Sequence, residues 1–196
     1  MNIHSTVLAP DSDKSEAILE AALDLFVDRG FHGTSVPSVA HKAGVAAGTI
    51  YHYFASKEAL VNALYKNLKR QIIARVMTDF PLGAPTREQF RTVWGRMAEF
   101  AVKHPREFAF LELHHHSSYL DAESVALETQ IVEFGANLIK EAQEAQVLKP
   151  LPPDLLMEFA NGAFIGVFRA GLAGRIPLTL ETFLSAERCG WEAIRA

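Results

Sequence analysis

Cysteine is almost absent from this sequence, in which Cys189 is the single thiol among 196 residues. A lone cysteine excludes an intrachain disulfide framework and a zinc finger built on cysteine. Long apolar runs are missing as well: none reaches the ~18 residues that a membrane span requires, and nothing resembles a signal peptide. We therefore expect a soluble, cytoplasmic protein with no membrane partner.

Signals for β structure and for catalysis are also scarce. The sequence shows no alternating strand pattern, no glycine-rich nucleotide loop and no internal repeat. No nucleophile motif, metal cluster or pair of catalytic carboxylates stands out, so we predict a protein that is not an enzyme and uses no cofactor. Hydrophobic residues make up 49% of the chain, enough for one large or two small domains. The predicted fold class is all-α.

Positive charge is in deficit overall, because the net charge is −4. It is nevertheless concentrated: residues 41–75 contain six lysines and arginines against Glu58 alone. Residues 1–40 and 81–196 are both acidic on balance. A run of basic residues is commonly just a solvated helix face, but beside the motif described next it favours binding to a polyanion.

Residues 34–57 carry the most informative pattern in the chain. Thr34 or Ser35 can cap a helix whose first turn accommodates Pro37. Gly44 follows at the place where a helix commonly ends in a residue with positive φ. The sequence therefore predicts a short helix that ends in a tight turn.

A second short helix is predicted over residues 47–53, with Ile50 and Phe54 on one side, four residues apart. Its other side is small at the start and polar or aromatic further on, which suits contact with phosphates and base edges. Two short helices joined by a tight turn indicate a helix-turn-helix in which the second helix reads DNA.

Two stretches carry a resemblance to a known family. Residues 43–60 read Ala-Gly-Val-Ala-Ala-Gly-Thr-Ile-Tyr-His-Tyr-Phe-Ala-Ser-Lys-Glu-Ala-Leu, and residues 22–36 read Ala-Leu-Asp-Leu-Phe-Val-Asp-Arg-Gly-Phe-His-Gly-Thr-Ser-Val. In order and spacing they resemble the DNA-binding domain of TetR-type transcriptional regulators, over roughly residues 14–65. Ala46 and Ala47 depart from the family, which often has Ser, Thr or a charged residue there, so two side-chain contacts to DNA are expected to be missing.

The motif and the resemblance together give a set of expected DNA contacts, with a phosphate contact at Lys57 implied by the resemblance. The set is Ser35, Val36, Ala47, Gly48, Thr49, Tyr51, His52, Tyr53 and Lys57.

The domain organisation follows from the helix signals. We expect a disordered N-terminus over residues 1–12, a helix-turn-helix domain over 13–57 and a helical effector-binding and dimerisation domain over 58–196. A long helix that begins after Ser56 joins the two domains. The remaining helices are predicted over residues 13–29, 86–104, 105–118, 121–145, 154–174 and 179–195, the second of these opening with a capping box from Thr86 to Gln89.

The predicted penultimate helix is apolar nearly all round and has small residues four apart: Gly162, Gly166, Ala170 and Gly174. Glycine in a helix costs about 1 kcal/mol relative to alanine, so a close contact must compensate. That contact is either tight packing within one subunit or a two-fold interface with a second chain. The resemblance implies a homodimer through the last two helices, with Trp191 added to the interface.

The resemblance also implies a small-molecule effector pocket in the body. Aromatic residues spread over four body helices are mostly core, but some of them, with a few polar neighbours, are candidate pocket residues. The candidates are Trp94, Leu111, His115, Tyr119, Phe134, Asn137, Phe164 and Phe168. Little charge lies in the penultimate helix, which indicates a neutral or weakly anionic, largely apolar ligand.

His114, His115 and His116 raise the question of a metal. Consecutive helical residues point about 100° apart, so three neighbours cannot all bind one ion. Glu112 with His115 or His116 would form half a site at most, and we predict no metal site.

The leading hypothesis is a homodimeric regulator, a repressor that leaves a palindromic operator in double-stranded DNA when an effector binds. The alternatives are an architectural DNA-binding protein without an effector, and a regulator whose effector is a metal.

Overall fold

The computed structural model describes residues 10–113 and 118–196, with side chains from residue 13 onward. This part of the chain contains nine helices and no strand, which confirms the all-α prediction. The helices are α1 (Pro10–Arg29), α2 (Val36–Ala43), α3 (Ala47–Tyr53), α4 (Lys57–Met77), α5 (Thr86–Lys103), α6 (Pro105–Leu113), α7 (Ala122–Glu144), α8 (Pro153–Leu172) and α9 (Leu180–Ile194).

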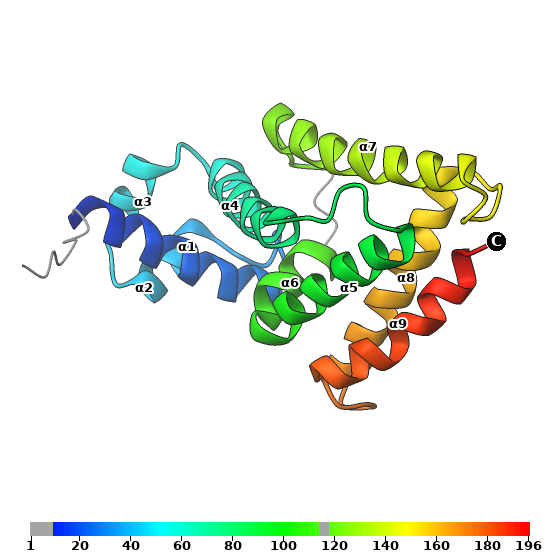
Figure 1. Cartoon of the computed structure of the whole chain (residues 1–196). Coiled ribbons are helices and arrows are strands. Elements are labelled where there is room, and N and C mark those ends of the chain that lie inside the picture. Colours follow the sequence, from blue (N-terminus) through cyan, green and yellow to red (C-terminus); the bar gives the residue numbers. More distant parts are fainter. Residues whose placement is uncertain (1–9, 114–117) are drawn as a thin grey trace, which may run out of the picture.

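Helices α1 to α3 form a small head at one end of the molecule (Figure 1). Ile18 and Phe26 on α1 are buried with Val39 on α2 and Ile50 on α3, so each helix contributes its apolar side to one shared core. These residues recur at helical spacing on α1 and α2, which explains why the short helices hold together. The head therefore presents its remaining surface, including most of α3, to solvent.

Helix α4 leads from the head into the body (Figure 1). It begins where the Ser56 hydroxyl accepts a hydrogen bond from the Ala59 amide at 3.1 Å, as the sequence predicts. With 21 residues it is about 31 Å long at ~1.5 Å per residue. Its buried residues Leu60, Leu64 and Leu68 join the core of the head to that of the body.

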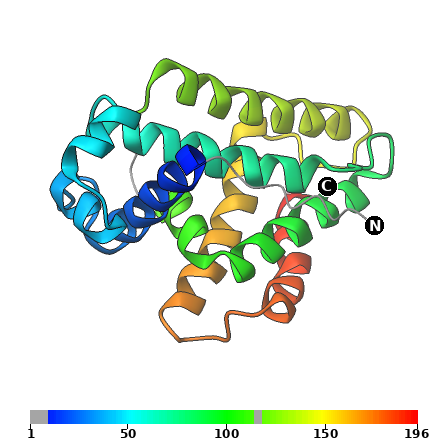
Figure 2. The ribbon, with the colours of Figure 1, turned by 90° about the vertical axis from the view of Figure 1, so that its left-hand side faces the viewer.

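The body is built around α5, α6, α8 and α9, and α7 lies across one side of them (Figures 1 and 2). Its core is aromatic. The ring of Trp94 meets Phe164 edge to face at 5.1 Å, and Phe164 stacks on Phe183 at 4.6 Å. The Trp94 indole N–H donates to the Phe183 carbonyl at 2.8 Å, so its polar atom is satisfied inside the core.

Two predictions about helix starts are wrong. Helix α1 begins at Pro10 rather than at residue 13, so the predicted disordered segment 1–12 overlaps it; residues 1–9 lie outside the described part. Pro85 is the N-cap of α5 and makes no side-chain capping bond, and the Gln89 amide donates to the Ala84 carbonyl instead of completing a capping box. Helix α6 is described as far as Leu113, and the next part of its predicted range, residues 114–117, lies outside the described residues.

Helix α8 is the one described helix that is long and apolar enough, by length and composition, to span a membrane. Helices that pack in the core or interface of water-soluble proteins meet the same criterion. The uncovered side of α8 is considered below.

Candidate nucleic-acid interface

The first helix of the motif, α2, has both ends fixed by its own sequence. The Ser35 hydroxyl accepts from the Ser38 amide at 3.3 Å, and the Ser38 hydroxyl accepts from the Ser35 amide at 3.2 Å. Gly44 ends the helix with φ 68°, a conformation that other residues adopt at a cost. The cap at Ser35 and the turn at Gly44 are both as predicted from the sequence.

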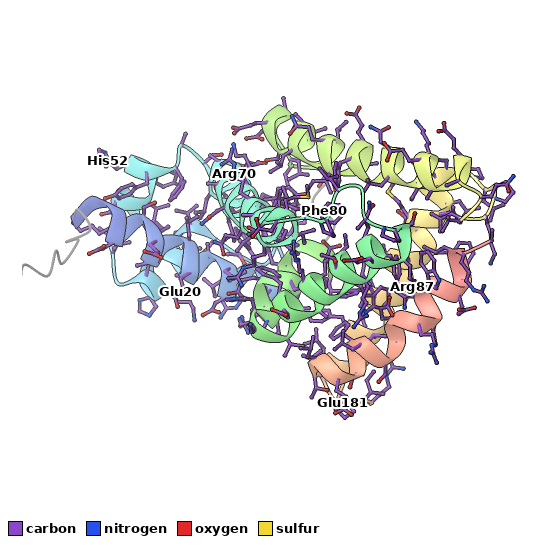
Figure 3. All side chains as sticks on the ribbon, in the orientation of Figure 1. Glu20, His52, Arg70, Phe80, Arg87 and Glu181 are labelled. Atoms are coloured by element: carbon purple, nitrogen blue, oxygen red, sulfur yellow. The ribbon has the colours of Figure 1, made fainter. Side chains whose placement is uncertain are left out.

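The second helix, α3, turns its DNA-reading side away from the body. Ile50 is its buried anchor, while Gly48, Tyr51 and His52 are exposed, Tyr51 by 55%. Figure 3 shows His52 projecting outward at the tip of the head. Ala46, at the N-cap, makes no side-chain capping bond, so the first turn keeps backbone N–H groups that no cap residue satisfies.

Four predicted contacts are less accessible than expected. Val36 is buried in the core of the head, so its side chain offers no surface to DNA. Ala47 and Tyr53 pack against the same core and are half-buried, as is Thr49. Of the predicted contacts, the exposed ones are therefore Ser35, Gly48, Tyr51 and His52.

Lys57 has a structural role that the sequence did not reveal. Its ammonium donates to the Phe31 carbonyl at 2.8 Å and to the Thr34 carbonyl at 3.0 Å. The same nitrogen lies 4.0 Å from the centre of the Phe31 ring. The Lys57 ammonium therefore satisfies two carbonyls of the loop between α1 and α2, and only part of its hydrogen-bonding capacity remains for a DNA phosphate.

Most of the basic residues of α4 face the body rather than a ligand. Lys66 lies 2.6 Å from Glu123, Lys69 lies 3.5 Å from Glu112, and Arg70 lies 2.7 Å from Glu123. The bond from Lys66 is the main cause that lowers the pKa of Glu123. Much of the positive charge that the sequence concentrates in residues 41–75 is therefore paired, on α4, with carboxylates of α6 and α7.

Lys42 is the one lysine or arginine on the two helices of the motif, and the sequence-based contact set omitted it. Its ammonium lies 2.9 Å from the Asp24 carboxylate on α1 and remains 43% exposed. The hydrogen bond from Lys42, helped by nearby Arg106, holds the pKa of Asp24 below its usual range. Helical position alone could have identified Lys42, because it lies in the last turn of the first motif helix.

Comparison with known proteins identifies the family. Residues 18–64 match the family described as bacterial regulatory proteins, tetR family, and residues 65–196 match the tetracyclin repressor-like C-terminal domain. The chain belongs to the TetR family. It is a DNA-binding transcription regulator, and that family is one of regulators rather than enzymes.

Individual relatives agree over shorter or longer stretches. The fatty acid metabolism regulator protein of Bacillus subtilis is 37% identical over 76 residues, 39% of this chain and 39% of that protein. The HTH-type transcriptional regulator RutR of Escherichia coli K12 is 47% identical over 57 residues, 29% of this chain and 27% of RutR. The matched segment thus spans well under two thirds of either relative.

Solved structures match over nearly the whole chain. A TetR family transcription regulator from Marinobacter aquaeolei VT8 superposes with a TM-score of 0.82 at 28% identity, covering 94% of this chain and 97% of that one. A TetR-family regulator from Haemophilus influenzae superposes with a TM-score of 0.70 at 25% identity, over 96% and 100%.

The effector residues predicted for this TetR-family body do not meet in one place. Trp94, Leu111, Phe164 and Phe168 are buried core residues, and their space is filled by one another and by neighbouring rings. Phe134 lies edge to face with Phe80 at 5.9 Å, whereas Asn137 is exposed on the same helix, α7. Tyr119 lies against the head, and His115 falls outside the described residues.

A groove of about 760 Å³ does run along the outer side of α5, but it coincides with none of the predicted residues. Two arginines that line it are engaged within the chain. Arg87 forms a bidentate ion pair with Glu187, with one nitrogen–oxygen distance of 2.8 Å, and Arg96 donates to the carbonyls of Val76 and Thr78. Figure 3 shows Arg87 beside α9.

The small-residue face of α8 is uncovered within the chain. A Cβ added at Gly162 or Gly166 would meet nothing within 4 Å, so these glycines do not serve close packing inside the subunit. Gly174, predicted on the same face, lies beyond the end of α8 with φ 67°. On the same helix Phe159 is 56% exposed and Leu155 42%.

Trp191, also expected at the dimer interface, lies on α9. It is buried within the chain, where its ring lies 5.5 Å from Phe90 and beneath the Arg87 guanidinium at 5.2 Å. Among the described residues no group of three histidine, cysteine or acidic side chains could hold a metal ion. His114 and His116, like His115, lie outside the described part.

Proposed function

We propose that the protein is a homodimeric repressor that binds a palindromic operator and is released by a largely apolar effector. The proposal is supported chiefly by two exposed surfaces, one on the head and one on the body. On the head, the side of α3 formed by Gly48, Tyr51 and His52 is free to enter a groove of DNA. On the body, an apolar face of α8 has no cover within the chain.

The α8 face supports the homodimer. An apolar, glycine-containing helix face allows two backbones to approach closely, and a two-fold axis brings the same face of each chain together. Burying the exposed half of Phe159 and of Leu155 there would contribute about 1 kcal/mol for each side chain. A dimer of this kind would carry two heads, as the two half-sites of a palindrome require.

The first test of the proposed function is selection from a random duplex library with the full-length protein. A two-fold dimer should enrich an inverted repeat whose half-site centres are one helical turn apart, about 34–36 Å, or a multiple of that distance. The enriched duplex should bind well above random duplex of the same length at the same salt. Enrichment of a single unrepeated motif, or of none, would remove the palindromic operator from the proposal.

The effector is inferred from the inner side of α7. Ser124, Ile131 and Ala142 share that side, because separations of seven and eleven residues return to nearly the same helix face. Ser124 and Ala142 are buried, whereas Ile131 between them is 36% exposed. Helix α7 is therefore well packed near its two ends and less covered in the middle, where a small apolar molecule would gain contact with Ile131.

A thermal-shift screen of apolar and weakly acidic metabolites, followed by operator titration with each stabilising compound, tests the effector. A true effector weakens operator binding, and a tenfold change requires about 1.4 kcal/mol of coupling between the two sites. Ile131→Trp should occupy the less covered middle of α7 and abolish the effect of the compound on operator affinity. Asn137→Ala, an exposed change on the same helix, should retain that effect. Compounds that stabilise the protein without changing operator affinity would argue against this effector role.

A second function has an observation in its favour. Trp94, Phe164 and Phe168 pack directly with neighbouring rings instead of lining a space, which suits an architectural DNA-binding protein with a filled body. Such a protein would show weak sequence preference and no effector response, so the same two experiments separate the two functions. Either function places the protein with the DNA, and we propose a cytoplasmic location.

A further inference from the structure

A buried asparagine ties the long helix to the body with all of its hydrogen-bonding groups in use. Asn62 on α4 is 3% exposed. Its amide nitrogen donates to the carbonyls of Glu58 at 2.8 Å and Tyr119 at 2.7 Å. Its amide oxygen accepts from the Asp121 backbone at 2.8 Å and from the buried Ser124 hydroxyl at 2.8 Å. The segment 119–124 is thereby held at one point of α4 in one orientation.

The same segment touches the head through an aromatic ring. Tyr119 stacks on Phe31 with ring centres 4.2 Å apart and planes within 18°. Phe31 belongs to the loop between α1 and α2, and its ring also contacts Phe26 in the head core, the neighbouring His32 ring and the Lys57 ammonium. A side chain from the body is therefore inserted into the packing of the head.

The contact continues to the start of the DNA-binding motif. Lys57 links the Phe31 and Thr34 carbonyls, and the Thr34 hydroxyl donates to the carbonyls of Leu25 at 3.0 Å and Gly30 at 2.9 Å. Thr34 directly precedes Ser35, the N-cap of α2. Body segment 119–124 and the first exposed residue of the motif are thus joined by successive direct contacts.

Head and body are also joined by buried apolar packing, including the rings of Phe26 and Phe110 at 6.2 Å, and by ion pairs of another kind. Arg106 on α6 bridges Asp24 and Asp28 on α1 at 2.8 Å, but these side chains are a third to more than half exposed. Exposed ion pairs adjust readily and are screened by salt. A buried amide with four partners and a stacked ring fix an angle much more strictly.

We propose that the junction formed by Asn62, Tyr119 and Phe31 positions the head on the body and so sets the half-site spacing that the dimer accepts. The proposal rests on the proposed function, because spacing has meaning only for a dimer on a palindrome. A tilt of about 6° over the ~31 Å of α4 moves the head by about 3 Å, close to one base-pair rise. Small changes of angle at the junction therefore decide which operators fit.

The test compares Tyr119→Ala with Tyr119→Phe, which keeps the ring, in the full-length protein. The probes are the duplex selected by the wild type and versions with one base pair added or removed between the half-sites. Each added base pair also rotates one half-site by about 36°. Wild type and Tyr119→Phe should lose about tenfold or more in affinity on the altered duplexes, since the DNA must deform to fit. For Tyr119→Ala the ratio of affinities for the selected duplex and the altered duplexes should be several-fold smaller.

A duplex carrying one half-site provides the readout that separates positioning from DNA contact. Affinity for that duplex, and its dependence on salt, should be the same in all three proteins, because the contacts of each head are untouched. If Tyr119→Ala is poorly folded by circular dichroism, Tyr119→Leu keeps apolar bulk without the planar ring and takes its place. Asn62→Leu, which removes the four hydrogen bonds, should relax the spacing preference in the same direction.

Three results would overturn the proposal. The first is a folded Tyr119→Ala protein that discriminates between spacings as well as the wild type, and the second is a Tyr119→Phe protein that loses as much of this discrimination as Tyr119→Ala. The third is weaker binding of Tyr119→Ala to the single half-site. Failure of the wild type to select any palindrome is a different result. It would remove the proposed function itself and with it the basis of the inference.

Discussion

At the scale of single residues, Tyr51 and Lys57 both belong to the predicted set of DNA contacts, and their surroundings in the structure differ. Tyr51 is 55% exposed on α3, so its loss removes surface and little packing. Lys57 holds two backbone carbonyls and a ring inside the head. Truncation of Tyr51 should therefore change DNA affinity, and truncation of Lys57 should change the stability of the fold.

Tyr51→Ala should weaken DNA binding about tenfold with an unchanged urea midpoint, whereas Lys57→Ala should lower the free energy of unfolding by about 1 kcal/mol or more. The physical reason for the second effect is that Phe31 and Thr34 lose a charged donor. Urea unfolding followed by circular dichroism, with anisotropy titration of labelled duplex, measures both. An unchanged midpoint in Lys57→Ala would show that the contacts of its ammonium contribute no stability.

Salt dependence offers a second residue-level prediction, because each lysine that neutralises a phosphate steepens the salt slope by about 0.9. Lys42→Ala, acting once in each head of a dimer, should reduce the slope by about 1.8. Lys66→Ala should leave the slope unchanged, since that side chain is only 16% exposed and lies against two carboxylates, whereas Lys42 pairs with Asp24 alone and is 43% exposed. The measurement is operator affinity across a salt series. A large change in slope for Lys66→Ala would mean that α4 contacts DNA directly.

Several individual residues lay beyond what the sequence could predict, for identifiable physical reasons. Helical periodicity identifies Ile50 as buried because one helix suffices to define its side. The position of Lys57 depends on two carbonyls more than twenty residues away, and that of Trp191 on Arg87 and Phe90. Such long-range contacts leave no local pattern in the sequence, so the contacts of Lys57 and Trp191 within the chain were not predicted.

At the scale of helices, local chemistry predicted the ends well where a cap was free to act. Ser35, Ser56, Asp121 and Thr179 each accept a hydrogen bond from the backbone of the residue three places on. Thr86 failed as a cap because α5 already starts there and Pro85 occupies the N-cap. The pattern from Thr86 to Gln89 places the N-cap at Thr86, one residue too late. Proline has a fixed φ and no N–H, and here Pro85 takes the N-cap position instead.

The pairing of α1 with α6 gives a prediction about pH. Because Lys42 and Arg106 lower the pKa of Asp24, the stability from its charged form is present above the ordinary aspartate pKa of about 4. That stability is lost as pH falls through the lowered pKa of the folded state. Arg106→Ala should thus destabilise the protein by roughly 0.5 kcal/mol near pH 6, a small figure because the pair is partly exposed.

The difference between wild type and Arg106→Ala should shrink as pH falls below about 4 and the Asp24 carboxylate becomes protonated. Urea unfolding at a series of pH values measures it, and Arg91→Ala, an exposed change on α5, serves as a control for the loss of one positive charge. A difference that stays constant down to pH 3 would assign the effect to the Arg106 side-chain packing instead of its charge.

At the scale of the whole molecule, the distribution of uncovered apolar surface says more than any single motif. Leu155, Phe159 and Leu172 on α8 and Leu184 on α9 are each more than two fifths exposed. The sequence predicted that α8 must be covered on every side, yet the chain itself covers only one. A helix of this composition is stable in water when a second surface completes the burial.

Gly166 provides the sharpest test of what that second surface is. In the isolated chain a Cβ at Gly166 or at Gly95 on α5 would meet nothing within 4 Å, so alanine at either position should stabilise its helix by up to about 1 kcal/mol. If two α8 helices cross closely in a dimer, only Gly95→Ala keeps that benefit. Gly166→Ala should then lower the thermal midpoint, and Gly166→Leu should give monomers in sedimentation at micromolar concentration.

The dimer also predicts a thermal midpoint that rises with protein concentration in the wild type and in Gly95→Ala, since association stabilises the folded chain by mass action. Gly166→Leu, as a folded monomer, should lose this dependence and bind the single half-site while losing the palindrome. A wild type that sediments as a ~22 kDa monomer, with Gly166→Ala as stabilising as Gly95→Ala, would instead leave the face of α8 open to a different partner. The sign of the alanine effect at one glycine therefore decides how the two heads are brought together.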